Sequence, residues 1–196
     1  QGNNVVAFGN VSGTSVTATG LSPGTEYDAF VRANCGGSQS SYKGPISFTT
    51  PCAVLTAPFT ENFDGANFDA VNNTIDNCWV RSDDGDGFVW EVETSGSNNS
   101  SNTGPDDDVS GGGNYLFTEA TGSPSGAKAF FNTPQIDLSP LASPQMKISY
   151  HMFGSDMGTF NVEVKDVNAG TYNTEFTISG QQQSGESEPF TEQTID

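Results

Sequence analysis

Acidic side chains are the residues of this sequence whose types and spacing are best suited to chemistry. They gather in three short clusters: Asp83, Asp84 and Asp86; Asp106–Asp108; and Glu61 with Asp64. Hard cations such as Ca²⁺ bind six to eight oxygen ligands, and a cation also relieves the repulsion between neighbouring carboxylates. Each cluster is therefore a candidate metal site, with a solvated turn as the alternative. The first cluster lacks the closing Glu of an EF-hand loop, which makes it the weaker candidate.

Catalytic patterns find little support in the sequence. His151 is the single histidine, which excludes histidine-rich zinc sites. It lies in a strand-like stretch with no nucleophile motif nearby, so we expect it to be structural. Gly111–Gly113 precede a strand rather than a helix, unlike a phosphate-binding loop. No isolated carboxylate pair suggests a glycosidase. We therefore predict no catalytic residues in this segment.

Charge separates the chain into two parts and excludes some partners. The 24 acidic and 6 basic residues give a net charge of −18, which argues against nucleic acid as a partner. Residues 1–52 are neutral overall, whereas residues 53–196 carry all of the excess negative charge. No apolar run approaches the ~20 residues of a membrane span. The chain opens at Gln1 without a start Met or a signal peptide, so we expect further domains of a parent protein on both sides.

The first part has the alternation of β-strands. Side chains alternate in character over residues 27–34 after a Pro-Gly turn, and β-branched runs occur at Val16–Thr19 and residues 46–50. Leu-x-Pro-Gly-Thr-x-Tyr, Val-Arg-Ala-x-Cys and Phe-Thr-Thr-Pro resemble the C-terminal half of a fibronectin type III domain. The resemblance covers roughly residues 11–51 of a first domain at residues 1–51, and it places Tyr27 at a tyrosine corner, where its hydroxyl contacts upstream backbone. It implies a partial β-sandwich that acts as a spacer.

The second part is longer, and it also shows no sustained helical period. Two-residue alternation over 146–152 and 160–164, with a predicted opening strand at Thr60–Asp64, indicates antiparallel sheets. Residues 52–196 resemble a MAM domain, the jelly-roll module named after meprin, A5 and receptor phosphatase mu, and also bacterial cleaved-adhesin domains. The pieces that carry this resemblance are Cys52, Cys78-Trp79, Trp90, Gly-Pro-x-x-Asp at 104–108, Gly-x-Tyr at 113–115 and the stretch 148–154. The predicted fold is therefore all-β, a partial fibronectin III sandwich followed by an antiparallel jelly-roll β-sandwich whose closing strands are missing.

The MAM resemblance implies a disulfide and a metal site. It pairs Cys52 with Cys78 and leaves Cys35, whose natural partner we place upstream of Gln1. Spacing alone proves no connectivity, and three free thiols are the alternative. It also implies a structural Ca²⁺ held by Glu61 and Asp108, with Asp64 and Asp106 as lesser candidates. Disulfides in turn indicate an oxidising, extracellular compartment.

Two functions are consistent with these features. The first is a noncatalytic adhesion or ligand-binding segment of a large secreted or cell-surface protein, of bacterial type by its composition, with an unknown glycan or protein as its ligand. The second is a set of accessory modules that target a secreted hydrolase, a protease or polysaccharidase, to its substrate. Pure spacing is a third possibility. Trp79, Trp90 and Tyr115 are expected in the core, with a sugar-stacking face as the alternative.

Overall fold

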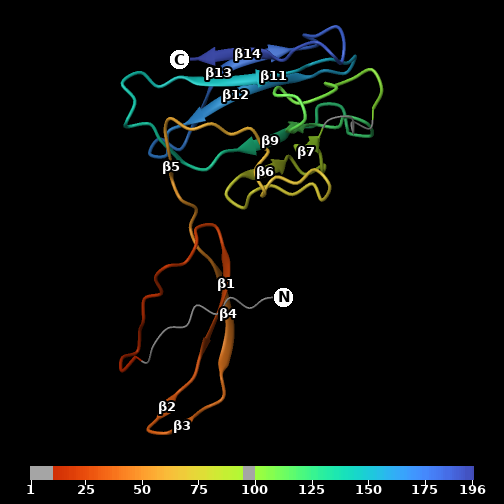
Figure 1. Ribbon diagram of the computed structural model, residues 1–196. Helices are drawn as coiled ribbons and strands as arrows, with labels where there is room; N and C mark the ends of the chain where they lie inside the picture. Colours follow the sequence, from red (N-terminus) through yellow and green to blue (C-terminus); the bar gives the residue numbers. More distant parts are fainter. Residues whose placement is uncertain (1–10, 95–99) are drawn as a thin grey trace. The chain divides into compact units, whose positions relative to one another are not determined.

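We describe a computed structural model of the chain, covering residues 11–94 and 100–196. All regular secondary structure in these residues is β, as the sequence predicts (Figure 1). The described residues contain no helix with the length and apolar character needed to span a membrane. The chain divides into two compact units, residues 1–53 and 54–196.

The first unit is built on one antiparallel hairpin. Strands β1 (Glu26–Val31) and β4 (Lys43–Thr49) pair with Tyr27 opposite Phe48, and the small hairpin of β2 (Asn34–Cys35) and β3 (Ser38–Gln39) lies between them in sequence. The Tyr27 hydroxyl accepts a hydrogen bond from the Ser22 backbone N–H (2.9 Å), the upstream contact predicted for this residue. The hairpin leaves apolar side chains in solvent, and Ile46 is 71% exposed.

One predicted strand is missing from each unit. Val16–Thr19 forms no strand. Its β-branched residues favour extended backbone, but the segment pairs with no other strand. Thr60–Asp64 also forms none. Phe63 has a φ of 63°, a left-handed conformation that a strand does not accommodate, and its N–H bonds to the Glu61 carboxylate (2.8 Å). Local side-chain contacts thus replace the predicted opening strand with a turn.

The second unit is a sandwich of short antiparallel pairs. On one side, β11 (Met146–Tyr150) pairs with β14 (Thr191–Ile195), and β12 (Thr159–Lys165) pairs with β13 (Tyr172–Ser179). On the other, β6 (Val80–Asp83) pairs with β9 (Ala129–Asn132), and β7 (Glu91–Thr94) pairs with β8 (Asn114–Phe117). Strands β5 (Leu55–Thr56) and β10 (Ile136–Asp137) form a short parallel pair. Figure 1 shows β11–β14, in cyan to blue, on one side and β6, β7 and β9, in olive to green, on the other.

Aromatic side chains fill the second unit. Trp79 is 9% exposed and stacks on Phe131 of β9, with ring centroids 5.3 Å apart, while Phe68 and Val92 complete the buried cluster. The Trp90 and Phe160 rings lie 6.2 Å apart and join the two sides of the sandwich. Stacked and edge-to-face pairs of this kind add to the free energy gained by burying their area. The core expected at Trp79 and Tyr115 is therefore present.

Candidate functional site

The carboxylates of Asp64 and Asp108 meet at the start of β8. Asp64 Oδ1 accepts a hydrogen bond from the Asn114 N–H (2.6 Å), and Asp108 Oδ1 accepts one from the Gly113 N–H (2.8 Å). Gly113 has no side chain to separate them. A Cβ at this position would lie 2.9 Å from Asp108 Oδ2 and closer still to Asp64 Oδ1. The glycine thus creates the space in which two acids from distant parts of the sequence face one another.

Asp108 is held as a carboxylate by its own loop. It is 8% exposed, and burial by itself raises its pKa. Hydrogen bonds from the Ser110 hydroxyl and from backbone N–H groups of the 110–113 loop outweigh that cost, and together they lower the pKa to about 2. Asp108 is therefore ionised at every physiological pH, the state that a hard cation requires.

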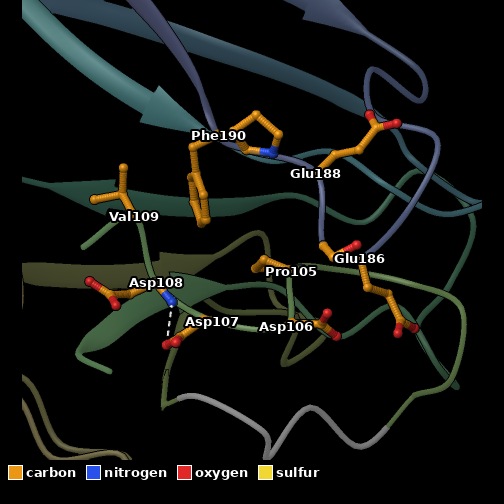
Figure 2. A pocket seen from close by; sticks show the side chains of 10 residues that line it. Pro105, Asp106, Asp107, Asp108, Val109, Glu186, Glu188 and Phe190 are labelled. Carbon is orange, nitrogen blue, oxygen red and sulfur yellow. Dashed lines mark hydrogen bonds between the residues drawn. The ribbon is translucent and has the colours of Figure 1, made fainter. Parts of the chain in front are cut away.

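Glu61 and Asp106, the other two predicted metal ligands, are placed differently from Asp64 and Asp108. Glu61 caps the turn at Phe63, as described above, and Figure 2 shows the side chains of Asp106 and Asp108 pointing away from one another. Within residues 11–94 and 100–196, no group of three or more His, Cys, Asp or Glu side chains converges as a metal cluster would. The structure thus brings together Asp64 and Asp108 of the four predicted ligands. Two carboxylates are too few for Ca²⁺, so backbone carbonyls and water would have to supply its other ligands.

Two carboxylates of the acidic loop at residues 83–86 form hydrogen bonds with backbone N–H groups nearby in the same turn. Asp83 accepts a short hydrogen bond from the Gly87 N–H, and Asp86 accepts one from the Phe88 N–H (2.9 Å). Gly85 and Gly87 both adopt positive φ, which a turn this tight requires. Asp84, which lies between Asp83 and Asp86 in the sequence, is exposed. These contacts account for the turn, and the loop's metal binding remains a prediction.

A pocket of about 340 Å³ opens beside the Asp108 loop (Figure 2). Two segments line it, residues 105–109 and residues 186–190, and they are joined by a hydrogen bond from the Asp106 N–H to the Glu186 carbonyl (3.1 Å). Both acidic and apolar side chains line it. We call it the acidic pocket, and its lining side chains are Pro105, Asp106, Asp107, Asp108, Val109, Glu186, Ser187, Glu188, Pro189 and Phe190.

Tyr115 and His151 carry buried polar atoms and interact electrostatically with acidic residues of this pocket. The Tyr115 hydroxyl accepts and donates no hydrogen bond, although the residue is 7% exposed. Burial, followed by the negative charges of Glu93, Asp107 and Asp106, raises its pKa to about 12. Both ring nitrogens of His151 are also buried, and its ring lies 5.5 Å from that of Phe190.

The acidic pocket was not predicted as a site. Asp106–Asp108 were singled out, but Glu186, Glu188 and Phe190 were not. The only signal in the sequence is the short acidic run Glu-Ser-Glu before a proline and an aromatic residue. Nothing local indicates that this run lies against residues 105–109.

The cysteines follow the implied pattern. Cys52 and Cys78 are disulfide-bonded, and Cys35 is free and exposed. The alternative of three free thiols is therefore wrong. His151, which the sequence analysis treated as structural, lies beside Phe190 with no nucleophile bonded to it.

Comparison with known families identifies the second unit. Residues 66–186 match the MAM domain family, described as meprin/A5/mu. This chain belongs to the MAM family. The match begins after Asp64 and includes residues 105–109 of the acidic pocket, but of its second segment only Glu186. The predicted MAM resemblance is confirmed for these residues.

Two curated relatives share part of the MAM chain. It is 33% identical over 107 residues to Neuropilin-1a of Danio rerio, covering 53% of this chain and 11% of that protein. It is 36% identical over 81 residues to Tenascin-N of Mus musculus, covering 40% of this chain and 5% of that protein. The chain thus spans a small fraction of the length of either relative. No solved structure matches it significantly.

Proposed function

We propose that this chain is a noncatalytic adhesion or ligand-binding segment of a secreted or cell-surface protein. The observation that carries the proposal is the MAM match over residues 66–186 in a β-sandwich that contains a disulfide. Disulfides persist in oxidising environments, which favours an extracellular location. Binding through loops on a rigid sandwich is the mechanism that this architecture favours.

A fibronectin-like spacer is the proposed role of residues 1–51. The pairing of β1 with β4 and the hydrogen bond from the Ser22 N–H to the Tyr27 hydroxyl support it, because a tyrosine corner uses this type of contact. The spacer would present the MAM unit without contributing chemistry of its own.

Structural Ca²⁺ is the proposed cofactor of the MAM unit. The support is the convergence of Asp64 and Asp108 at Gly113, together with the ionised state of Asp108 at physiological pH. Adjacent carboxylates repel each other, so a bound cation would stabilise the folded state. Glu61 and Asp106 would contribute only after their side chains turn toward this pair.

Retention on immobilised ligands tests the proposed function. The full chain is passed over a panel of polysaccharides and extracellular proteins, once with CaCl₂ and once with chelator. We expect specific retention of the native chain on at least one ligand and none of the heat-denatured chain. Absence of retention throughout a broad panel would favour a pure spacer.

A further inference from the structure

We propose that Asp84 is a site of spontaneous covalent modification, at which the link between Asp84 and Gly85 rearranges to isoaspartate. This inference is independent of the proposed binding function. The chain contains three Asp-Gly pairs, Asp64-Gly65, Asp84-Gly85 and Asp86-Gly87. All three have the same reacting groups, so the folded structure decides which of them reacts.

The rearrangement needs only water and the chain itself. The backbone nitrogen of the glycine attacks Cγ of the preceding aspartic acid and forms a C–N bond. The N–H proton and the carboxyl hydroxyl leave as water, which closes a five-membered succinimide. Water then adds to one of the two ring carbonyls. Addition at the side-chain carbonyl restores aspartate, whereas addition at the main-chain carbonyl leaves the backbone running through the side chain as isoaspartate, with no net change in mass.

Both residues of the Asp84-Gly85 pair are exposed. In the part of the chain that the structure describes, neither the Asp84 carboxylate nor the Gly85 N–H forms a hydrogen bond. Nothing lies within 4 Å of a Cβ built on Gly85. Rotation about the χ1 and ψ bonds of Asp84 can therefore bring Cγ to the glycine nitrogen without a clash. Groups held so close in one chain react at a high effective concentration once they are aligned.

Hydrogen bonds hold both reacting groups of the Asp86-Gly87 pair. The Gly87 N–H donates to Asp83 Oδ2, and Asp86 Oδ1 accepts from the Phe88 N–H (2.9 Å). The attacking nitrogen and the carboxyl group are thus both engaged. These bonds must break before the two groups can meet, which raises the barrier to succinimide formation relative to the Asp84-Gly85 pair.

The Asp64-Gly65 pair is held through its carboxylate. Asp64 Oδ1 accepts a hydrogen bond from the Asn114 N–H (2.6 Å), and Oδ2 accepts one from the Asn62 side-chain amide (2.6 Å). The carboxyl group cannot rotate toward the Gly65 nitrogen without losing them. Asp64 is exposed, as Asp84 is, so exposure does not distinguish these pairs. The hydrogen bonds do.

The modification would change the loop that follows β6. Isoaspartate places one additional carbon atom in the main chain and shortens the side chain that carries the free carboxylate. The turn closed by Asp83 and the Gly87 N–H would then span a longer backbone. The carboxylates of residues 83–86 would no longer keep their present spacing.

The test is peptide mapping of the full chain after several weeks in warm, mildly acidic buffer prepared with H₂¹⁸O. Trypsin places Asp64 in the peptide 44–81 and the other two aspartates in the peptide 82–128. Electron-transfer fragmentation distinguishes isoaspartate from aspartate at each position, and an incorporated ¹⁸O atom marks passage through the succinimide. We expect at least about fivefold more isoaspartate at Asp84 than at Asp86 or Asp64, the factor that corresponds to one typical hydrogen bond.

A parallel incubation in urea supplies the matched control. Unfolding removes the hydrogen bonds, so the three pairs should react at similar rates. Asp83→Ala removes the acceptor of the Gly87 N–H, and it should raise isoaspartate at Asp86 while leaving Asp64 unchanged. Asp84→Glu should abolish the modification at residue 84, because the longer side chain would have to close a six-membered ring.

Several results would overturn the proposal. These are equal isoaspartate at the three positions of the folded chain, an excess at Asp86 or Asp64, or no isoaspartate in the folded chain while the unfolded chain reacts. An excess at Asp84 that is equally large in urea would also overturn it, because the cause would then be local sequence rather than structure. Since the native chain contains all three pairs, the outcome does not depend on the folding of a variant.

Discussion

The carboxylates of Asp64 and Asp108 accept hydrogen bonds from consecutive backbone N–H groups, those of Asn114 and Gly113. The first acid belongs to the turn after β5, and the second to the loop before β8. Two adjacent backbone positions thus fix two side chains that the sequence separates widely. The predictions below begin from this arrangement.

Replacing Gly113 with alanine should destabilise the MAM unit. Gly113 does not have a left-handed φ, so the added methyl group acts only by occupying the space between the two carboxylates. We expect a loss of about 1–3 kcal/mol in the free energy of unfolding, the usual cost of overpacking. Gly158→Ala is the matched control, because nothing lies within 4 Å of its Cβ position. Urea unfolding of both variants measures the difference, and equal losses would contradict the crowding at Gly113.

Calcium should raise the melting temperature through Asp64 and Asp108. A ligand at a hundred times its Kd adds about 2.7 kcal/mol to the stability of the state that binds it. We expect Asp64→Asn and Asp108→Asn each to reduce the rise seen by calorimetry on adding CaCl₂. Asp83→Asn should leave the rise intact. Loss of the rise only in Asp83→Asn would instead place the ion in the loop at residues 83–86.

Acid should remove the stabilising contribution of Asp108. Its folded pKa, about 2, lies below the ordinary value of 3.8, so the folded state favours the carboxylate. The contribution is complete above pH 3.8 and is lost as pH falls toward 2. We expect Asp108→Asn to lose on the order of 1–2 kcal/mol at pH 7, after allowance for solvent screening. The gap between native and variant proteins should close by about pH 2, and a gap that persists there would show that charge is not its cause.

His151 should make the MAM unit less stable in mild acid. Burial lowers its pKa below 6.5, although the charges of Glu188 and Asp106 act in the opposite direction. The unfolded state then binds the proton more readily, so stability decreases as pH falls below 6.5. We expect the free energy of unfolding to drop between pH 7.5 and 5.5 and the drop to be smaller in His151→Phe. Equal slopes in the two proteins would contradict this assignment.

The strands of the fold could be predicted because the alternation of apolar and polar residues shows which face of a strand is buried. Residues 146–150 and 160–164 illustrate this, and both stretches lie in strands. Thr60–Asp64 was mistaken for a strand because carboxylate and amide contacts from Glu61 and Asn62 outweigh its propensity. Such contacts depend on side-chain geometry, which a hydrophobic pattern does not encode.

The candidate sites were only partly predictable for a similar reason. The MAM resemblance pointed to Glu61 and Asp108, with Asp64 and Asp106 as lesser candidates, whereas the structure brings Asp64 rather than Glu61 to Asp108. It did not indicate Gly113, whose importance arises from what a Cβ would contact. The acidic pocket depends on the contact between Asp106 and Glu186, two residues far apart in the chain. Long-range contacts of this kind have no signature in a single sequence.

The cysteine content has a practical consequence for any binding assay. Cys52 and Cys78 are locked in a disulfide, which leaves Cys35 as the one exposed thiol of the chain. A maleimide reagent will therefore attach a dye or a solid support at a single position in the first unit, with the MAM unit unmodified. The same thiol allows two copies to be crosslinked, and such a dimer would gain avidity on a multivalent surface without any new contact.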